Sequence, residues 1–298
     1  MIEVKNVTKT FEGFHALDDV TLTIPNGSVY GLVGPNGAGK TTLIKHLQGI
    51  YRQDNGAITV DDAPIWENPD VKSRLLSIPD DLYYNSQTTI EDMMRFYKGI
   101  YPKFSKERFD KLQKVFEIDP RKQIRKLSKG MQKQVWFWIA LSCQPEYLVL
   151  DEPVDGLDPM MRRNVWSLVL NDVSEHGLTV MVSSHNLREL EDVCDNVGIM
   201  DHGKMVLERS LEQLQDNIVK LQLVFPDWIT EIPRDIDYMH AEKVGRVVTL
   251  IIRKNAEEAT AMVQKYDPLF VDAIPLTLEE IFIYELGGDK NAVKEFIL

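Results

Sequence analysis

The sequence contains few cysteines, no long apolar run and no excess of basic residues, and each deficit excludes a class of protein. Cys143 and Cys194 are the only cysteines and form no C-x-x-C pair, so we expect neither a disulfide nor a zinc site. No uninterrupted apolar stretch approaches the roughly 20 residues that a membrane-spanning helix needs. The formal net charge of -12 is the wrong sign for a long nucleic-acid footprint, so nucleic acid is not expected as a partner.

The N-terminus also lacks the features of an export signal. It has neither a basic start followed by an apolar block nor a small-residue cleavage site, so we expect a cytoplasmic protein. With 44% hydrophobic and 27% charged residues, the composition is ordinary for a soluble chain. The 298 residues are enough for two domains.

The order of hydrophobic patterns predicts an α/β protein. Strand-like segments, either alternating or continuously apolar, occupy residues 1–11, 20–24, 28–34, 146–152 and 178–185. Helical spacing follows the last three of these, over residues 40–51, 160–177 and 186–197. A helix after each buried strand predicts a mostly parallel sheet.

Two parts of the chain depart from this alternation. Residues 86–145 begin with two amphipathic helical patterns separated by Pro102, which predicts a helical subdomain. Beyond residue 210 the patterns read strand, strand, helix, strand, helix, which predicts a small α+β extension. We therefore expect one domain over 1–210 and an accessory domain over 211–298.

The segment "GPNGAGKT" fits the pattern G-x-x-x-x-G-K-[ST] between a predicted strand and a predicted helix. Such a loop folds its backbone N–H groups around phosphates, beside the positive end of the helix. The lysine then contacts the β and γ phosphates, and the threonine hydroxyl holds Mg²⁺. The residues expected to bind ATP here are Gly34, Pro35, Asn36, Gly37, Ala38, Gly39, Lys40, Thr41 and Thr42.

Acidic and imidazole groups stand at the ends of two later strands. Asp151 and Glu152 follow an apolar run, where one carboxylate can hold Mg²⁺ and the next can polarise the attacking water. His185 ends the strand "VMVSS" and can orient the γ-phosphate or that water. Taken alone, an acidic pair or a lone histidine at a strand end is more often an ordinary surface feature; the phosphate loop reverses that balance for the acidic pair.

The segment "LSKGM" precedes an apolar helical pattern and has two interpretations. Ser128 can cap that helix for the chain's own stability, or the exposed N–H groups and hydroxyl can face a phosphate. The local sequence leaves both open. In the helix that follows, Trp136, Phe137 and Trp138 are dense enough to indicate core packing.

Together these motifs resemble the ATP-binding cassette (ABC) ATPases, the P-loop motor subunits of ABC transporters. The resemblance covers about residues 1–210, and the order and spacing are more specific than any single motif. Its landmarks are Gly34–Thr42, Leu127-Ser128, Asp151-Glu152, Asp158 in "DGLDP" and His185. The ending "LTLEEIFIYELGG" resembles bacterial drug, peptide and antibiotic exporters, and "LSKGM" with "IPDD" is most similar to their YtrB-like branch.

The resemblance implies a role for each matching residue. Phe11 stacks on adenine, Thr41 and Asp151 serve Mg²⁺, Glu152 is the catalytic base and His185 is the γ-phosphate switch. ATP and Mg²⁺ are thus the implied cofactors.

The family also implies a partner, because its signature segment reaches the ATP of the opposite subunit in a head-to-tail dimer. Here that segment contributes Ser128, Lys129 and Gly130, and Asp158 would lie on the dimer seam. Lys129 and Met131 replace the first glycine and the glutamine that family members commonly carry. Met131 cannot hydrogen-bond as an amide does, whereas the charge of Lys129 still favours phosphate.

A second departure concerns the metal. The family usually has a glutamine where this chain has Asp80, and Gln87 is an alternative if the loop is registered differently. A carboxylate binds Mg²⁺ more strongly than an amide but repels phosphate when the metal is absent.

The resemblance implies an ATPase subunit, peripheral on the inner face of the cell membrane, that drives separate integral membrane subunits, with export as the expected direction. Trp66, Tyr83 and Tyr84 flank the helical subdomain that contacts membrane subunits in this family. The alternatives are a soluble ABC ATPase in DNA repair or translation, and a non-hydrolysing regulatory module governed by ATP. Glu152 argues against the second, because a base has little purpose without hydrolysis.

Overall fold

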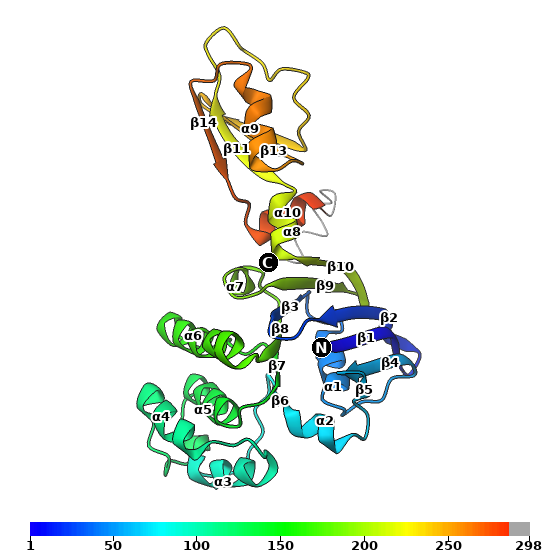
Figure 1. The fold of residues 1–298 in the computed structure, drawn as a ribbon, viewed down its shortest axis with the longest axis vertical. Coiled ribbons are helices and arrows are strands. Elements are labelled where there is room, and N and C mark those ends of the chain that lie inside the picture. The colour runs from blue at the N-terminus through cyan, green and yellow to red at the C-terminus, as the bar shows by residue number, and fades with distance from the viewer. Residues whose placement is uncertain (286–298) are drawn as a thin grey trace. The chain divides into compact units, whose positions relative to one another are not determined.

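The computed structural model describes residues 1–285, which form two separate units (Figure 1). The first unit comprises residues 1–185 and 193–208. The second comprises residues 186–192 and the part that follows residue 208. The end of the expected accessory domain, residues 286–298, lies outside the described residues and includes the last three residues of "LTLEEIFIYELGG".

A six-stranded sheet in the first unit has the order β10-β9-β3-β8-β7-β6. Its strands are β3 (Val29–Val33), β6 (Leu75–Ile78), β7 (Tyr147–Asp151), β8 (Thr179–Ser184), β9 (Asn196–Asp201) and β10 (Lys204–Ser210). The pairs β6–β7, β7–β8, β8–β3 and β3–β9 are parallel, and every residue of β3, β7 and β8 is buried. The predicted fold class, a P-loop α/β core with a mostly parallel sheet, is confirmed.

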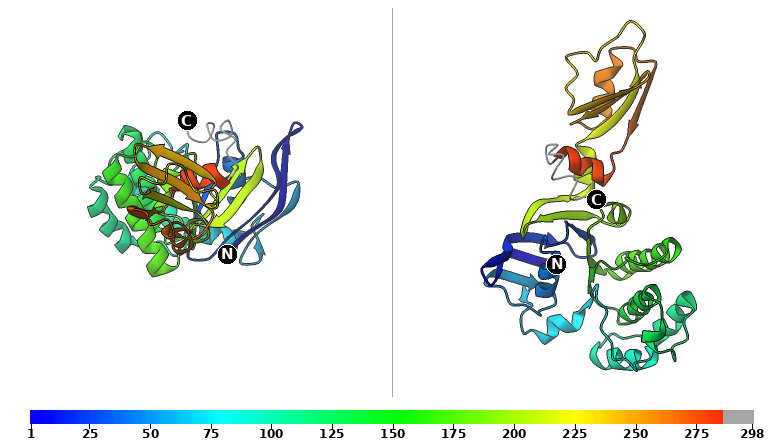
Figure 2. Two further views of the ribbon diagram at one scale, coloured as in Figure 1. Left: turned by 90° about the horizontal axis from the view of Figure 1, so that it is seen from above. Right: turned by 180° about the vertical axis from the view of Figure 1, so that it is seen from behind.

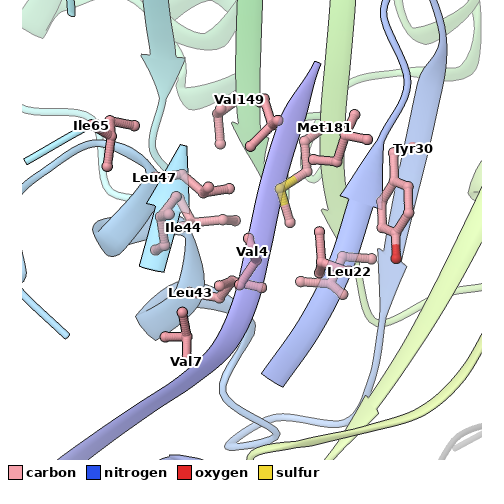
Figure 3. Packing of buried hydrophobic residues seen from close by; sticks show 14 of the residues in the cluster. Val4, Val7, Leu22, Tyr30, Leu43, Ile44, Leu47, Ile65, Val149 and Met181 are labelled. Atoms are coloured by element: carbon pink, nitrogen blue, oxygen red, sulfur yellow. The ribbon is translucent and has the colours of Figure 1, made fainter. Parts of the chain in front are cut away.

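A second, antiparallel sheet has the order β2-β1-β4-β5, with strands β1 (Ile2–Phe11), β2 (Phe14–Ile24), β4 (Asn55–Val60) and β5 (Ala63–Pro64). Helix α1 (Lys40–Leu47) packs between the two sheets (Figure 3). Its Leu43, Ile44 and Leu47 contact the same core as Val4 of β1 and Val149 of β7. Burial of this apolar face fixes the helix that follows the phosphate loop.

The helical subdomain contains α3 (Ile90–Ile100), α4 (Lys106–Phe116), the 3₁₀ turn η1 (Ile124–Lys126) and α5 (Lys129–Ser142), which gather on one side of the unit (Figure 1). Side chains mark three of the helix starts. Thr89 and Asp92 form a capping box at α3, and Ser105 and Ser128 cap α4 and α5. Both predicted amphipathic helices are therefore confirmed.

The aromatic residues of α5 belong to the core, as their density indicates. Trp136, Phe137 and Trp138 are all buried. The Trp138 indole stacks on Phe109 with 4.4 Å between ring centroids, and its N–H donates to the Phe109 carbonyl at 2.8 Å.

Replacing Trp138 with alanine is expected to lower the free energy of unfolding by about 3–5 kcal/mol, because it opens a large cavity and orphans the Phe109 carbonyl. Trp228 is 71% exposed, so Trp228→Ala should change it by no more than about 0.5 kcal/mol. Guanidinium unfolding of the two variants provides the measurement. Equal midpoints would show that Trp138 is not a core anchor.

One predicted helix is mostly wrong. The pattern over residues 186–197 yields only α7 (Arg188–Glu191), and strand β9 begins at Asn196. Leu190 of this pattern is buried in α7, whereas Val197 is buried on β9, which pairs with β3 from Asn196 onward. Just before β9, the Asp195 carboxylate accepts the Val29 N–H at 2.7 Å. Sheet pairing therefore overrides the local helical spacing. The other long helix, α6 (Pro159–His176), forms as predicted.

The second unit contains an antiparallel sheet of order β12-β13-β11-β14. Its elements are α8 (Leu211–Asp216), β11 (Val219–Val224), β12 (His240–Val244), β13 (Val247–Ile252), α9 (Ala256–Gln264), β14 (Phe270–Ile274) and α10 (Leu278–Glu285). Helix α9 packs on β11 and β14 through Ala259 and Val263 (Figure 2). The sequence did not predict α8 or β12. Four of the five residues of β12 are exposed, so that strand lacks a period-2 apolar pattern. A short polar helix such as α8 gives little apolar signal.

The remaining helix, α2 (Pro69–Arg74), belongs to the first unit. Asn68 caps it by accepting the Val71 N–H, and Pro69 occupies its first turn. No helix in the described range 1–285 combines the length and apolarity needed to cross a membrane.

Candidate nucleotide-binding site

The loop between β3 and α1 takes a path that requires glycine. Gly39 caps α1 with φ +105°, and a Cβ there would lie 2.7 Å from the Ala16 carbonyl oxygen. A Cβ on Gly34 would collide with the carbonyl of Met200 on β9. Both positions therefore exclude side chains, which lets the backbone turn tightly ahead of the helix. The loop lies where the sequence pattern predicts it.

Lys40 projects into this loop. Its ammonium donates to the carbonyl oxygens of Gly34 at 2.6 Å and Pro35 at 3.3 Å, and lies 3.6 Å from Glu152 Oε1. The side chain is only 6% exposed, and this burial lowers the pKa of Lys40 despite the attraction of Glu152 and Asp151. The ammonium is therefore positioned to contact an anion bound by the loop.

A cavity of about 400 Å³ opens beside the loop. It is lined by Phe11, Phe14, Ala16, Pro35, Asn36, Gly37, Ala38, Gly39, Lys40, Thr41, Thr42, Asp80 and Glu152. Phe11 is 38% exposed and contacts Tyr51 edge-on with 5.3 Å between ring centroids. A half-exposed aromatic ring, a phosphate loop, two hydroxyls and two carboxylates on one cavity match the parts of a metal-bound nucleotide.

The two predicted carboxylates at the end of β7 have different surroundings: Asp151 forms a hydrogen bond with a neighbouring strand, whereas Glu152 contacts Lys40 and His185. Asp151 is 4% exposed, and its Oδ1 accepts the Ser183 hydroxyl at 2.6 Å. Glu152 donates its backbone N–H to the Ser183 Oγ at 3.2 Å and has φ +45°. Burial raises the pKa of the Glu152 carboxyl, although Lys40 and His185 oppose the shift. A carboxyl with a raised pKa beside a phosphate site is suited to general-base chemistry.

His185 follows β8 and contacts Glu152, because β7 and β8 are neighbouring parallel strands. Its Nδ1 lies 3.0 Å from Glu152 Oε2. The Glu152 side chain is therefore held between Lys40 and His185. Asp155 adds a second carboxylate to this group, because one ligand atom each from Glu152, Asp155 and His185 lie within 4.8 Å of one another.

Ser128 caps α5 by accepting the Met131 N–H at 3.2 Å, which confirms the capping interpretation. Gly130 approaches the loop before α6, since a Cβ there would lie 2.8 Å from the Gly156 carbonyl oxygen. Asp158 caps α6 by accepting the N–H groups of its first turn. The cavity beside Lys40 has none of Ser128, Lys129, Gly130 and Asp158 among the described residues that line it.

Asp80 lies on the nucleotide cavity, whereas the alternative residue Gln87 contacts Gln123 through a 2.8 Å hydrogen bond. Asp80 also lines a neighbouring cavity of about 420 Å³ with Lys129 and Lys133. Its Oδ1 lies 3.4 Å from Lys133 Nζ. Sequence patterns did not single out Lys133, because a lysine in a helix usually faces solvent.

A phosphate loop between β3 and α1 and a carboxylate pair at the end of β7, a buried parallel strand of the same sheet, define the site of a P-loop ATPase. Residues 17–155 match the sequence family described as ABC transporter. The ABC transporter ATP-binding protein YtrB of Bacillus subtilis (strain 168) is 30% identical over 98% of this chain and 100% of its own length. The chain therefore belongs to the ABC transporter family, as an ATP-binding and ATP-hydrolysing subunit.

Two further similarities agree with this assignment. The probable multidrug ABC transporter ATP-binding protein YbhF of Escherichia coli (strain K12) is 31% identical over 72% of this chain and 38% of its own length. A solved structure of an ATP-binding subunit of an ABC transporter is 26% identical, with a TM-score of 0.67 over 72% of this chain and 92% of that one. The matched portion leaves more than a quarter of this chain uncovered in each case.

Proposed function

We propose that this chain binds Mg-ATP in the cavity beside Lys40 and hydrolyses it as one half of a head-to-tail dimer. The observation that carries the proposal is the contact of Glu152 with both Lys40 and His185 at the cavity. A base held between a phosphate-binding lysine and an imidazole can take a proton from water beside the γ-phosphate. Bound Mg²⁺ would neutralise charge on the β and γ phosphates.

The other residues divide the work of binding. Thr41 on the cavity and Asp151 at the end of β7 would supply oxygen ligands for Mg²⁺, and Asp80 would be a further oxygen donor on the cavity. The loop residues 34–42 surround the phosphates, and Phe11 offers its ring to adenine. The Ser183 hydroxyl holds Asp151, which fixes the orientation of that carboxylate.

In the proposed dimer, residues that do not line the chain's own nucleotide cavity would contact the second subunit or its nucleotide. Ser128 and Lys129 are exposed at the start of α5, where helix N–H groups and a cation favour an anion. We assign Ser128, Lys129 and Gly130 to the γ-phosphate held by a second copy or a related subunit. Asp158 at the start of α6 is assigned to the seam between the subunits.

The shared site is tested by Ser128→Ala in a Glu152→Gln background, in which slowed hydrolysis lets an ATP-bound dimer accumulate. Loss of a hydroxyl bond to a charged phosphate should weaken ATP-driven dimerisation by about 10- to 150-fold. Sedimentation measures the association, and a thermal melt without nucleotide measures the cap. Unchanged dimerisation with a lower melting temperature would leave Ser128 as a helix cap alone.

The membrane partner is assigned to the surface of the helical subdomain. Phe96 and Ile100 on α3 are 64% and 49% exposed, and Tyr83, which precedes the subdomain, is 88% exposed. Such exposure is unusual for large, mainly apolar side chains. We propose that they contact an integral membrane subunit and hold the chain at the inner face of the membrane. Export is the proposed direction, supported by the word multidrug in the name of the relative YbhF. Co-purification from native membranes with a multi-spanning protein tests this assignment.

The domain boundaries are part of the same proposal. We assign residues 1–210 to the ATPase domain, with its helical subdomain over 86–145, and residues 211–298 to an accessory domain. Residues 186–192, which include α7, are an exception to this division, because they cluster with the second unit. A chain truncated after residue 215 should still bind ATP.

A further inference from the structure

Lys133 is a buried cation that the ATPase mechanism described above does not use. It lies in the second turn of α5, and its side chain is only 9% exposed. Its ammonium donates to the backbone carbonyl oxygen of Glu152 at 2.7 Å and lies 3.4 Å from Asp80 Oδ1. One side chain of the helical subdomain therefore contacts both the end of β7 and the loop after β6.

Burying an ammonium is costly unless partners repay the lost hydration. Lysine is flexible and is strongly hydrated, so it normally extends into solvent. Here the ammonium instead has one short bond to a carbonyl and one ion pair with a carboxylate. Such an arrangement orders the groups that it joins, because each of them would lose a charge-assisted contact by moving.

The carbonyl that Lys133 contacts belongs to Glu152, the proposed base, whose carboxylate must be directed at the attacking water. Glu152 has φ +45°, a left-handed conformation that a residue with a Cβ adopts only when its surroundings hold it. Its N–H is held from one side by Ser183, and its carbonyl is held from the other by Lys133. These two bonds fix the peptide groups on both sides of the Glu152 side chain.

We propose that Lys133 is a positioning residue of the ATPase site, which sets the direction of the Glu152 carboxylate and restrains Asp80 at the edge of the nucleotide cavity. This inference rests on the proposed role of Glu152 as the base. Lys133 lies outside the residues that line the cavity beside Lys40 in the described structure, so it acts through Glu152 and Asp80.

The position of Lys133 on α5 adds a connection between sites. Ser128 caps the same helix five residues earlier, about 7.5 Å along the helix axis. In the proposed dimer, the helix start faces the partner's nucleotide while Lys133 holds the chain's own base. A shift of α5 would thus move both contacts together.

The first experiment compares Lys133→Met, Lys133→Gln and Lys133→Arg in the full-length chain. Methionine keeps the apolar stem and removes the donors, so kcat should fall by about 10- to 150-fold, while ATP affinity should change by less than about threefold. Arginine keeps a cationic donor and should restore most of kcat, with glutamine between the two. Lys114→Met on α4 is the matched control, because Lys114 is exposed.

Steady-state kinetics and equilibrium binding of a fluorescent ATP analogue separate rate from affinity. A merely structural role would lower the fraction of chains that bind ATP and leave kcat per binding-competent site unchanged. That result, or wild-type kcat in Lys133→Met, would overturn the inference. If Lys133→Met does not fold, the order arginine above glutamine remains the test, and equal kcat for these two variants overturns it.

A double-mutant cycle tests the Asp80 contact. Asp80→Asn and Lys133→Met remove the two ends of one ion pair, so the second substitution should cost less in kcat once the first is present. Fully additive losses would overturn the restraint on Asp80. Glu152→Gln is measured in parallel: wild-type turnover in that variant refutes the proposed base, whereas an inactive Glu152→Gln beside a fully active Lys133→Met refutes only the role of Lys133.

Discussion

Replacing Glu152 with glutamine is expected to reduce ATP hydrolysis by about 10²–10⁴-fold and to leave ATP binding intact. The amide keeps the size of the side chain and can still contact His185, but it cannot accept a proton from water. The ion pair with Lys40 is lost at the same time, which leaves the ammonium free for phosphate. The rate therefore falls through the chemical step rather than through affinity.

The acid side of the pH profile gives a second readout. A general base works when it is deprotonated, and burial raises the pKa of Glu152 above that of an ordinary carboxyl group. Wild-type hydrolysis should thus decline on acidification at a higher pH than an exposed glutamate would require. The residual rate of Glu152→Gln should not follow this decline.

The measurement is phosphate release at saturating Mg-ATP, with ATP affinity determined by calorimetry. Glu175→Gln on α6 is the matched control, because Glu175 is exposed and lies outside the cavity lining in the described structure. Wild-type turnover in Glu152→Gln would assign the base to another group.

The parts of the site that were predictable from sequence are those carried by contiguous or strand-end residues. The phosphate loop is one unbroken segment, so its spacing alone identifies Lys40. Glu152 and His185 end neighbouring parallel strands, and such ends meet at the same edge of a sheet. Their 3.0 Å contact follows from that topology.

Contacts between distant segments leave no such signal. Lys133, Glu152 and Asp80 meet only because α5, β7 and the loop after β6 fold together. Their separations along the sequence follow neither a helical nor a strand period. The helical pattern of 186–197 was mostly wrong for a related reason: α7 ends at Glu191, and from Asn196 the chain pairs with β3 as strand β9. Local patterns therefore predict elements better than they predict which residue of one element contacts another.

Replacing Lys40 with alanine is expected to weaken ATP binding by about 10²–10⁴-fold. The ammonium would bond two phosphate groups, and charge-assisted hydrogen bonds contribute about 1.5–3 kcal/mol each. It is already buried at the loop, so little side-chain entropy remains to be lost when ATP binds. The loss should therefore approach the full value of the two bonds.

The fold should survive, because the backbone path of the loop is set by Gly34 and Gly39 and α1 is held by its apolar face. Lys45→Ala, on the same helix, is the matched control, since Lys45 contacts the Tyr51 ring rather than the phosphate loop. Calorimetry with Mg-ATP gives both affinities, and thermal melts without nucleotide verify folding. If Lys40→Ala binds ATP as tightly as Lys45→Ala, the anion must bind elsewhere, and Glu152 and His185 would no longer stand beside the γ-phosphate.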